Sequence, residues 1–276
     1  MYQKVLFLLD LEGVNFVEGE PYEGLVRECA QWQIARDQGV KEVNAAAQAL
    51  FAAGVDEVAL WDNHGAGKNI DVSLLDKRIR YLDVNTALPR MSFAANGAFD
   101  AVCFFGYHAM EGTLGGVLAH TMSSKTVQHY KLNGVYIGEV DIDAAIAASY
   151  GMPARFFAAG DIACRQASRV IPDVVSVVTK KELARNKAVF RDNEALLAEI
   201  QEKIVLAVRT PGTRHTLSFP LSFEKSFKRV EDAAKYFERL RAAGIAADYL
   251  DDEVLLKDAH TVVSTVNDMD EFIRCI

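Results

Sequence analysis

The sequence predicts an α/β protein with a mainly parallel sheet, helices on both faces, and a smaller C-terminal α+β domain. Two observations carry this prediction. Short apolar runs alternate with segments rich in helix-forming residues through the first two-thirds of the chain, and polar residues follow several of these runs directly. Continuous apolar runs are typical of strands buried on both faces of a sheet. Because strands and helices alternate, we expect helices on both faces and right-handed crossovers.

The expected elements of the first part follow in order along the chain. The first apolar run, residues 5–9, is a strand, and the long segment at 22–53 is helical because it is rich in helix formers and ends at Gly54, a common stop signal. The remaining elements are strands at 57–61, 79–82, 101–105, 134–139, 154–160 and 174–178, helical segments near 93, at 141–150 and from 161 to before 172, and an irregular glycine-rich stretch at 110–119.

The regular alternation of strands and helices ends near residue 180, which predicts two domains. Residues 1–180 form the α/β metal-binding catalytic domain, and residues 181–276 form the smaller domain, which we expect to serve oligomerisation or a substrate channel. A charged linker begins at residues 180–182. The later elements are a helix at 193–208, two short strands within 214–227 around Pro220, a helix at 230–243, strand pieces near Tyr249 and Val254, and a last helix from Thr265.

Composition narrows the class of protein. The chain has 276 residues, of which half are hydrophobic and a quarter charged, as in ordinary globular proteins. A net charge of −8 disfavours nucleic acid or an anionic membrane as the main partner. No two cysteines form a Cys-x-x-Cys pair, which argues against a disulfide framework and a cysteine zinc site. With no secretion signal or membrane span, we expect a cytoplasmic protein. The cysteines are Cys29, Cys103, Cys164 and Cys275.

Carboxylates and histidines follow the expected strands at the points where the strands end. Asp10 and Glu12 come after the first strand, and they share one side of an extended segment because they are two residues apart. His64 follows the strand at 57–61, His108 the strand at 101–105, and Glu139 the strand that begins at 134. In open α/β sheets, the ligand crevice lies outside the carboxyl ends of the strands. These five side chains are therefore expected to face one cavity.

Imidazoles and carboxylates together favour zinc, with manganese or iron as weaker alternatives. Five ligands exceed the four that a tetrahedral structural zinc requires, so a two-metal site is the simplest interpretation. Asp10 is the natural bridging ligand because it leaves its strand first. Taken one at a time, the acids could equally be solvated loop residues or helix caps, and each histidine an ordinary loop residue. The repetition of the pattern favours the metal site.

Five motifs follow one another along the chain: Asp10-Leu11-Glu12-Gly13, Asp62-Asn63-His64, Gly106-Tyr107-His108-Ala109, His120-Thr121-Met122 and Gly138-Glu139. They resemble, in order and nearly in spacing, the motifs of the DppA-type D-aminopeptidases, peptidase family M55. The resemblance spans about the first two-thirds of the chain and is loose in the last third. It extends to Gly151-Met152-Pro153 and Ala159-Gly160-Asp161.

The resemblance implies a binuclear zinc aminopeptidase, with two ions per subunit, that removes N-terminal D-residues from short peptides such as D-alanyl dipeptides. It further implies a ring-like, decamer-like homo-oligomer and places the family's catalytic histidine at His120. Two alternatives stay open: a metal-dependent hydrolase of another amide or of L-peptides, and a non-catalytic metal-binding or peptide-binding protein. The metal ligands implied by the family are Asp10, Glu12, His64, His108 and Glu139.

Overall fold

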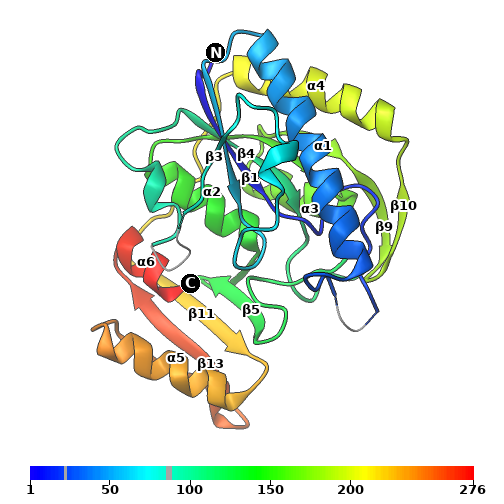
Figure 1. Cartoon of the computed structure of the whole chain (residues 1–276). Helices are drawn as coiled ribbons and strands as arrows, with labels where there is room; N and C mark the ends of the chain where they lie inside the picture. The colour runs from blue at the N-terminus through cyan, green and yellow to red at the C-terminus, as the bar shows by residue number, and fades with distance from the viewer. Residues whose placement is uncertain (22–23, 85–88) are drawn as a thin grey trace.

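The computed structural model describes residues 1–21, 24–84 and 89–276 (Figure 1). Its main sheet has six parallel strands in the order β3-β2-β1-β4-β7-β8. The predicted fold class is confirmed. The strands are β1 (Lys4–Leu9), β2 (Glu57–Asp62), β3 (Arg80–Tyr81), β4 (Ala101–Tyr107), β7 (Ala154–Ala159) and β8 (Val175–Val178).

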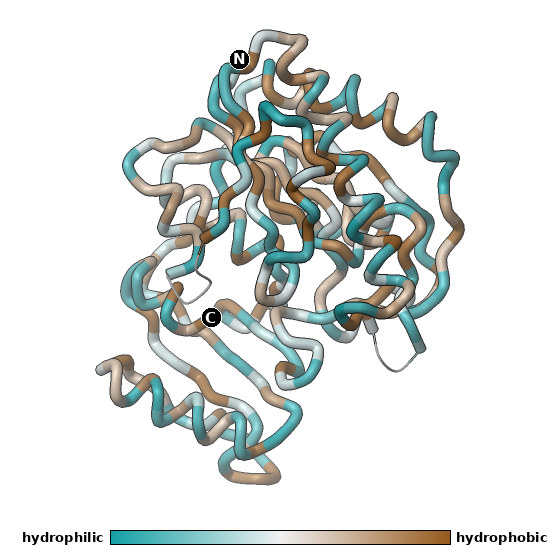
Figure 2. Tube along the Cα trace, in the orientation of Figure 1, coloured by the Kyte–Doolittle hydropathy of each residue, from teal (hydrophilic) through white to brown (hydrophobic). Residues whose placement is uncertain are grey.

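Helices cover both faces of this sheet. On one face lie α1 (Ala30–Ala52) and α4 (Asn193–Arg209), which pack against each other; on the other lie α2 (Glu139–Ser149) and α3 (Asp161–Val170). Successive residues of β1 point to opposite sides, so Phe7 packs in the core under α1 while Leu6 and Leu8 pack in the core on the other side. Figure 2 shows these strands as the hydrophobic centre of the molecule.

The order of the strands reverses between β1 and β4. From β1 the chain moves outward through β2 to β3, and it then returns to place β4 on the other side of β1. At such a switch point the loops after the two neighbouring strands leave in opposite directions and open a crevice. Asp10 follows β1 and His108 follows β4 directly, so both residues lie at the edge of this crevice.

The second sheet is antiparallel and has five strands in the order β12-β13-β11-β5-β6. Helix α5 (Val230–Ala242) packs on this sheet, and α6 (Met269–Cys275) contacts α2 and β13. Two strands of this second sheet, β5 and β6, come from the first 180 residues, and α4, which follows residue 180, packs on the main sheet. The division into two domains at residue 180 stays a prediction. The strands are β5 (Val127–Leu132), β6 (Val135–Ile137), β11 (Leu221–Phe227), β12 (Ala247–Asp252) and β13 (Leu256–Val266).

Several expected elements differ from the structure. The segment predicted as a charged linker at 180–182 is part of a hairpin, β9 (Lys180–Ala184) and β10 (Lys187–Phe190). Only one strand lies within 214–227, and it begins after Pro220. Thr265 lies in β13, paired with Ser222 of β11, and the last helix begins four residues later. Strand pairing decided the local structure in two of these cases: β9 pairs with its neighbour β10, and β13 pairs with the distant strand β11.

The long first helix begins later than expected. Cys29 caps α1 by accepting a hydrogen bond from the backbone N–H of Trp32, and Glu28 before it has a positive φ of 74° that ends any helix upstream. Residues 22–23 of the expected helix lie outside the described residues. The short helix η1 (Val72–Leu74) was not expected, and η2 (Ser92–Ala94) lies where helical material near residue 93 was predicted. Among the described residues, no helix combines the length and apolarity that crossing a membrane requires.

Candidate metal centre

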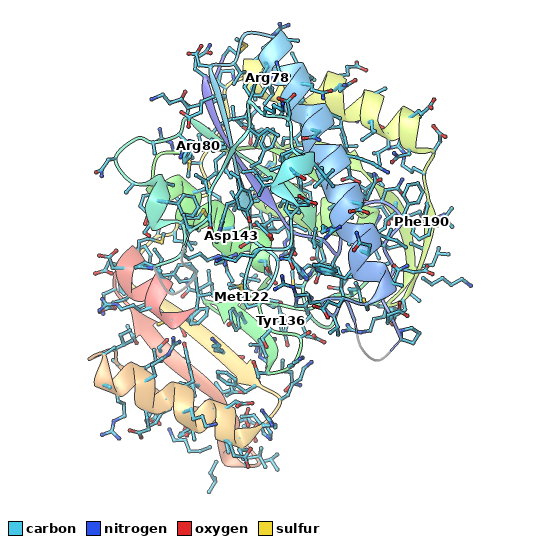
Figure 3. All side chains as sticks on the ribbon, viewed as in Figure 1. Arg78, Arg80, Met122, Tyr136, Asp143 and Phe190 are labelled. Atoms are coloured by element: carbon cyan, nitrogen blue, oxygen red, sulfur yellow. The ribbon has the colours of Figure 1, made fainter. Side chains whose placement is uncertain are left out.

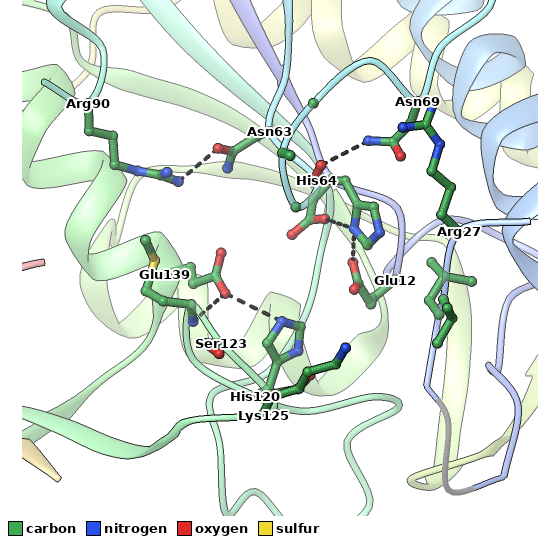
Figure 4. Close-up of a pocket in the computed structure, with 18 residues that line it drawn as sticks. Glu12, Arg27, Asn63, His64, Asn69, Arg90, His120, Ser123, Lys125 and Glu139 are labelled. Atoms are coloured by element: carbon green, nitrogen blue, oxygen red, sulfur yellow. Dashed lines mark hydrogen bonds and ion pairs between the residues drawn. The ribbon is translucent and has the colours of Figure 1, made fainter. Parts of the chain in front are cut away.

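The five predicted ligands meet outside the carboxyl ends of the strands. Figure 4 labels three of them, Glu12, His64 and Glu139, in the wall of the cavity. Asp10 and Glu12 lie on the loop after β1, His64 two residues after β2, and His108 directly after β4. Glu139 is the first residue of α2, where a carboxylate is favoured by the partial positive charge of a helix N-terminus. The structure therefore brings together side chains from four separate elements.

Two glycines allow the ends of β1 and β4 to approach closely. Gly13 donates a backbone hydrogen bond to the carbonyl of Gly106 at 2.6 Å, and a Cβ at either glycine would overlap backbone of the opposite segment. Gly106 also has a φ of +68°, which residues with side chains rarely adopt. The glycine of each motif is thus required by the contact that places Asp10 beside His108.

The distances show two overlapping clusters. His64 Nδ1 lies 2.9 Å from Asp10 Oδ1 and 3.1 Å from Glu12 Oε2. His108 Nε2 lies 3.5 Å from Asp10 Oδ2 and 3.3 Å from Glu139 Oε1. Asp10 faces both histidines, one with each carboxylate oxygen, which is the position that a bridging ligand would require. All of these side chains except that of His64 belong to buried residues.

The donor set fits a metal ion. His108 Nδ1 lies 3.0 Å from its neighbour's carbonyl, that of Ala109, so this nitrogen donates a proton there and Nε2 is the atom that could bind a metal ion. That Nε2 is buried and has no hydrogen-bond partner among the described residues. Ligand atoms lie within 4.8 Å of one another in two groups that share His108: one with Asp10 and Glu12, the other with His120 and Glu139. Carboxylates and imidazoles in this arrangement suit zinc.

The pKa directions describe the same cluster in electrostatic terms. Burial alone would raise the pKa of Asp10, but hydrogen bonds and positive charge from His108 and His64 hold it well below its ordinary value. Burial likewise opposes protonation of His64, yet the charges of Glu12 and Asp10 raise its pKa to about 11. Without a cation, protons on the histidines balance the buried carboxylates. A divalent ion would replace those protons when it binds.

His120, which was predicted to be catalytic, lies beside these ligands. Its ring stacks on that of His108 with centroids 3.9 Å apart, and its Nε2 lies 3.8 Å from Glu139 Oε1. Its Nδ1 lies 2.8 Å from the carbonyl of Leu118, which fixes the orientation of the ring. His120 is therefore placed either to act on a molecule bound in the cavity or to supply a further ligand atom.

The cavity above this cluster has a volume of about 460 Å³, which is within the usual range for small-molecule sites. Acids lie at its base, and three basic side chains also line it: Arg27, Arg90 and Lys125. Of the other three histidines, His129 pairs with Glu224 in the second sheet, and His215 and His260 do not line this cavity.

A buried network supports the residues that precede two of the histidines. Asp143 of α2 accepts two hydrogen bonds from Arg90, at 2.5 and 2.7 Å, and one from the hydroxyl of Tyr107 at 2.6 Å. Asn63 donates to Tyr107 and accepts from Arg90. Because Asn63 precedes His64 and Tyr107 precedes His108, this network fixes the backbone on which both histidines lie. Figure 3 shows Asp143 near the centre of the molecule.

A buried lysine holds the loop after β1. Lys180 of β9 donates to the carbonyls of Glu12, Val14 and Val17 at 2.5, 3.1 and 2.5 Å. Burial lowers the pKa of Lys180 to about 8, although nearby carboxylates oppose this. The lysine satisfies three backbone carbonyls that would otherwise be buried without partners, so it fixes the backbone at Glu12.

The comparisons with known proteins bear on the identity of this site. The model of peptidase family M55, described as D-aminopeptidase, matches residues 3–276. The chain belongs to this family. A D-aminopeptidase of Bacillus subtilis (strain 168) is 25% identical over 223 residues, which cover 78% of this chain and 80% of that protein. The prediction of a metallo-aminopeptidase of the M55 family is thus confirmed.

A solved structure supports the fold of this M55 peptidase. It is described as the Zn-dependent D-aminopeptidase DppA from Bacillus subtilis, a self-compartmentalizing protease, and it superposes with a TM-score of 0.84 at 21% identity. The match covers 98% of this chain and 94% of the other. The described residues, those of the second sheet included, therefore have the same fold as that protein.

The residues that support the ligands were not predicted from the sequence. Asp143 is four residues after Glu139 in α2, so the spacing that places both on one helix face was a usable signal. Tyr107 and Asn63 were within recognised motifs, but nothing in the sequence connected them to each other. Arg90 and Lys180 reach the site from segments with no motif, and only the folded chain brings them there.

Proposed function

We propose that this protein is a zinc-dependent D-aminopeptidase that binds two zinc ions per subunit and hydrolyses short peptides at an N-terminal D-residue. The observation that carries the proposal is the buried cluster at the switch point, in which Asp10 faces a histidine with each of its carboxylate oxygens. Family membership and a relative named as a zinc-dependent D-aminopeptidase support the metal and the reaction.

The proposed ligands divide into two groups around Asp10. Glu12 and His64 lie on one side of it, and His108 and Glu139 on the other. When bound, zinc supplies Lewis acidity that activates water and polarises the scissile carbonyl at neutral pH. The protein's part is to hold the ligands in place. Lys180 does this for the Glu12 loop, and the Asp143 network does so behind the two histidines.

We propose that His120 donates a proton to the leaving nitrogen. Cleavage of an amide requires this protonation, and histidine is the side chain that most often transfers protons in catalysis. Its Nδ1 is engaged by the carbonyl of Leu118, so Nε2 is the atom that faces the cavity near Glu139. Stabilisation of the tetrahedral intermediate is the alternative role for the same atom.

Short peptides fit the dimensions of the site. A cavity of about 460 Å³ admits a di- or tripeptide but not a folded chain. The B. subtilis structure is described as self-compartmentalizing, which supports a homo-oligomer, as predicted, whose assembly restricts access to the active sites. A cytoplasmic location is part of the proposal because all four cysteines are free thiols, as expected in a reducing compartment.

The test is hydrolysis of D-Ala-D-Ala and of L-Ala-L-Ala by the purified protein. Both are assayed with untreated, chelated and zinc-reloaded samples, and the zinc content of each sample is measured. We expect the D-dipeptide alone to be cleaved, with activity lost on chelation and restored by zinc. Equal cleavage of both would point to a peptidase without D preference, and cleavage of neither by zinc-loaded protein would point to another amide substrate or to a binding role.

A further inference from the structure

The cations that line the cavity are not equivalent. Arg90 is committed to Asp143 and Asn63, and the buried carboxylate opposite it is also held by Tyr107. Lys125 is exposed and forms no ion pair with any carboxylate in the described ranges. In Figure 4, its side chain lies beside that of His120 in the wall of the cavity. A charged donor in this position is available to a bound molecule.

The backbone that carries Lys125 is fixed. It lies in the turn that leads into β5, where Ser123 Oγ accepts hydrogen bonds from the N–H and the hydroxyl of Thr126 at 3.2 and 2.8 Å. The carbonyl of the preceding residue, Ser124, accepts a hydrogen bond from Lys228 Nζ at 2.7 Å. Because these hydrogen bonds hold the turn on both sides, the backbone of Lys125 has a defined position five residues after His120.

Nearby basic side chains show that pairing is the usual arrangement here. Lys131 pairs with Glu224, and Lys228 has Glu111 within 3.7 Å. The chain has 38 acidic and 30 basic residues, so carboxylates are in excess. Arg27, the other cation at the cavity, contacts the carbonyl of Lys68 at 3.3 Å and the face of Trp32, and it also lacks an ion pair within the residues described. Two cations thus line the opening above an acidic base.

We propose that Lys125 binds the C-terminal carboxylate of the peptide substrate, with Arg27 as a second, weaker contact. The inference rests on the proposed function, because it places the scissile bond at the cluster of Asp10, Glu12 and Glu139. A peptide whose N-terminal residue lies there would direct its other end toward the opening of the cavity, where the two cations are. Short peptides with a free carboxylate, dipeptides above all, are the substrate class that this arrangement selects.

The physical basis is a charge-assisted hydrogen bond, which is shorter and stronger than a neutral one. Without metal, three carboxylates at the base would repel an anionic substrate. The positive charge of two divalent ions would exceed the negative charge of these carboxylates. The loaded site would then attract an anionic substrate, and Lys125 would strengthen this attraction. Loss of one such charged contact lowers affinity by roughly ten- to hundredfold.

The experiment compares D-Ala-D-Ala with D-Ala-D-Ala amide, which have the same scissile bond and differ only in the terminal charge. In the Lys125→Met variant, we expect the ratio of kcat/KM for the acid to that for the amide to fall about tenfold or more, mainly through KM. Lys125→Arg should restore most of the ratio. Lys77→Met removes an exposed lysine that does not line the cavity, so it controls for net charge and should leave the ratio unchanged.

A second measurement needs no turnover. Calorimetry on zinc-loaded His120→Ala protein, with and without Lys125→Met, gives the Kd of the acid and of the amide directly, and the Kd of the acid alone should rise. An unchanged ratio in Lys125→Met would overturn the proposal, as would an equal loss on both substrates, which would place Lys125 at the reacting centre. If zinc-loaded wild-type protein cleaved neither substrate, the proposed function itself would fail and this inference with it.

Discussion

Replacing Asp143 by asparagine is expected to destabilise the protein and to weaken zinc binding together. The side chain of Asp143 is fully buried, and it is the only carboxylate recorded as pairing with Arg90 in the described residues. Burial would lower the pKa of Arg90, but the charge and hydrogen bonds of Asp143 raise it, so the guanidinium stays charged. Asparagine keeps the shape and one acceptor oxygen but leaves that charge uncompensated.

The magnitude follows from these contacts. Removal of one partner from a buried ion pair costs about 3–5 kcal/mol, because the other charge is left without a partner, and the 18% exposure of the Arg90 side chain reduces this cost. The oxygen retained by asparagine can still accept from Tyr107, so the lower end of this range is expected. Loss of support behind metal-binding histidines typically weakens metal affinity by about 10–100-fold. Both effects should appear in the same variant because Asn63 and Tyr107 directly precede His64 and His108.

Two assays check this. Urea unfolding of metal-free protein gives the change in stability, and competition with a chromophoric chelator gives the zinc affinity. Asp248→Asn serves as the control, because its ion pair with Lys257 is exposed and screened by solvent, and neither quantity should change. If Asp143→Asn unfolded at the wild-type urea concentration and bound zinc within twofold of wild type, the network would have no supporting role.

Three further predictions concern other residues. Burial raises the pKa of Glu42 to about 7 from its ordinary value of 4.5, so the folded state binds the extra proton, and the free energy of unfolding should fall as pH rises from about 4.5 to about 7, by at most about 3 kcal/mol. Urea unfolding across this pH range should show a flatter profile for Glu42→Gln, and an unchanged slope would refute the assignment. Lys180→Met removes three hydrogen bonds to the Glu12 loop and should lower both stability and zinc affinity, whereas Lys181→Met, at an exposed position, should change neither. His120→Ala should retain zinc, measured by elemental analysis, and lose most turnover; near-normal turnover would show that His120 is not the proton donor.

The predicted fold and ligand cluster rest on local information. Each strand of the main sheet is an apolar run, and the polar residues that follow it, such as Asp10 and His108, are adjacent in the sequence to the strand that positions them. Parallel topology then brings the strand ends together. The residues that support the cluster are different in kind. Arg90 reaches Asp143 across 53 residues and Lys180 reaches Glu12 across 168, and no local pattern encodes such contacts.

The same distinction explains the elements that were predicted wrongly. Residues 180–182 look like a linker because they are charged, yet Lys180 and Glu182 are buried: one caps the β1 loop and the other accepts from the backbone of Val117 and Ile162. A charged side chain is buried when specific partners surround it, and those partners are not visible nearby in the sequence. Thr265 was likewise assigned to a helix because its pairing with Ser222 is not local.

The most direct test of the central claim is anomalous diffraction at the zinc edge from crystals of the zinc-loaded protein. The account predicts two zinc peaks per subunit at the switch point of the main sheet, one contacted by Glu12 and His64 and the other by His108 and Glu139, with Asp10 reaching both. A single peak, a second ion held elsewhere, or zinc outside this cluster would contradict the assignment of these five residues as a two-metal site.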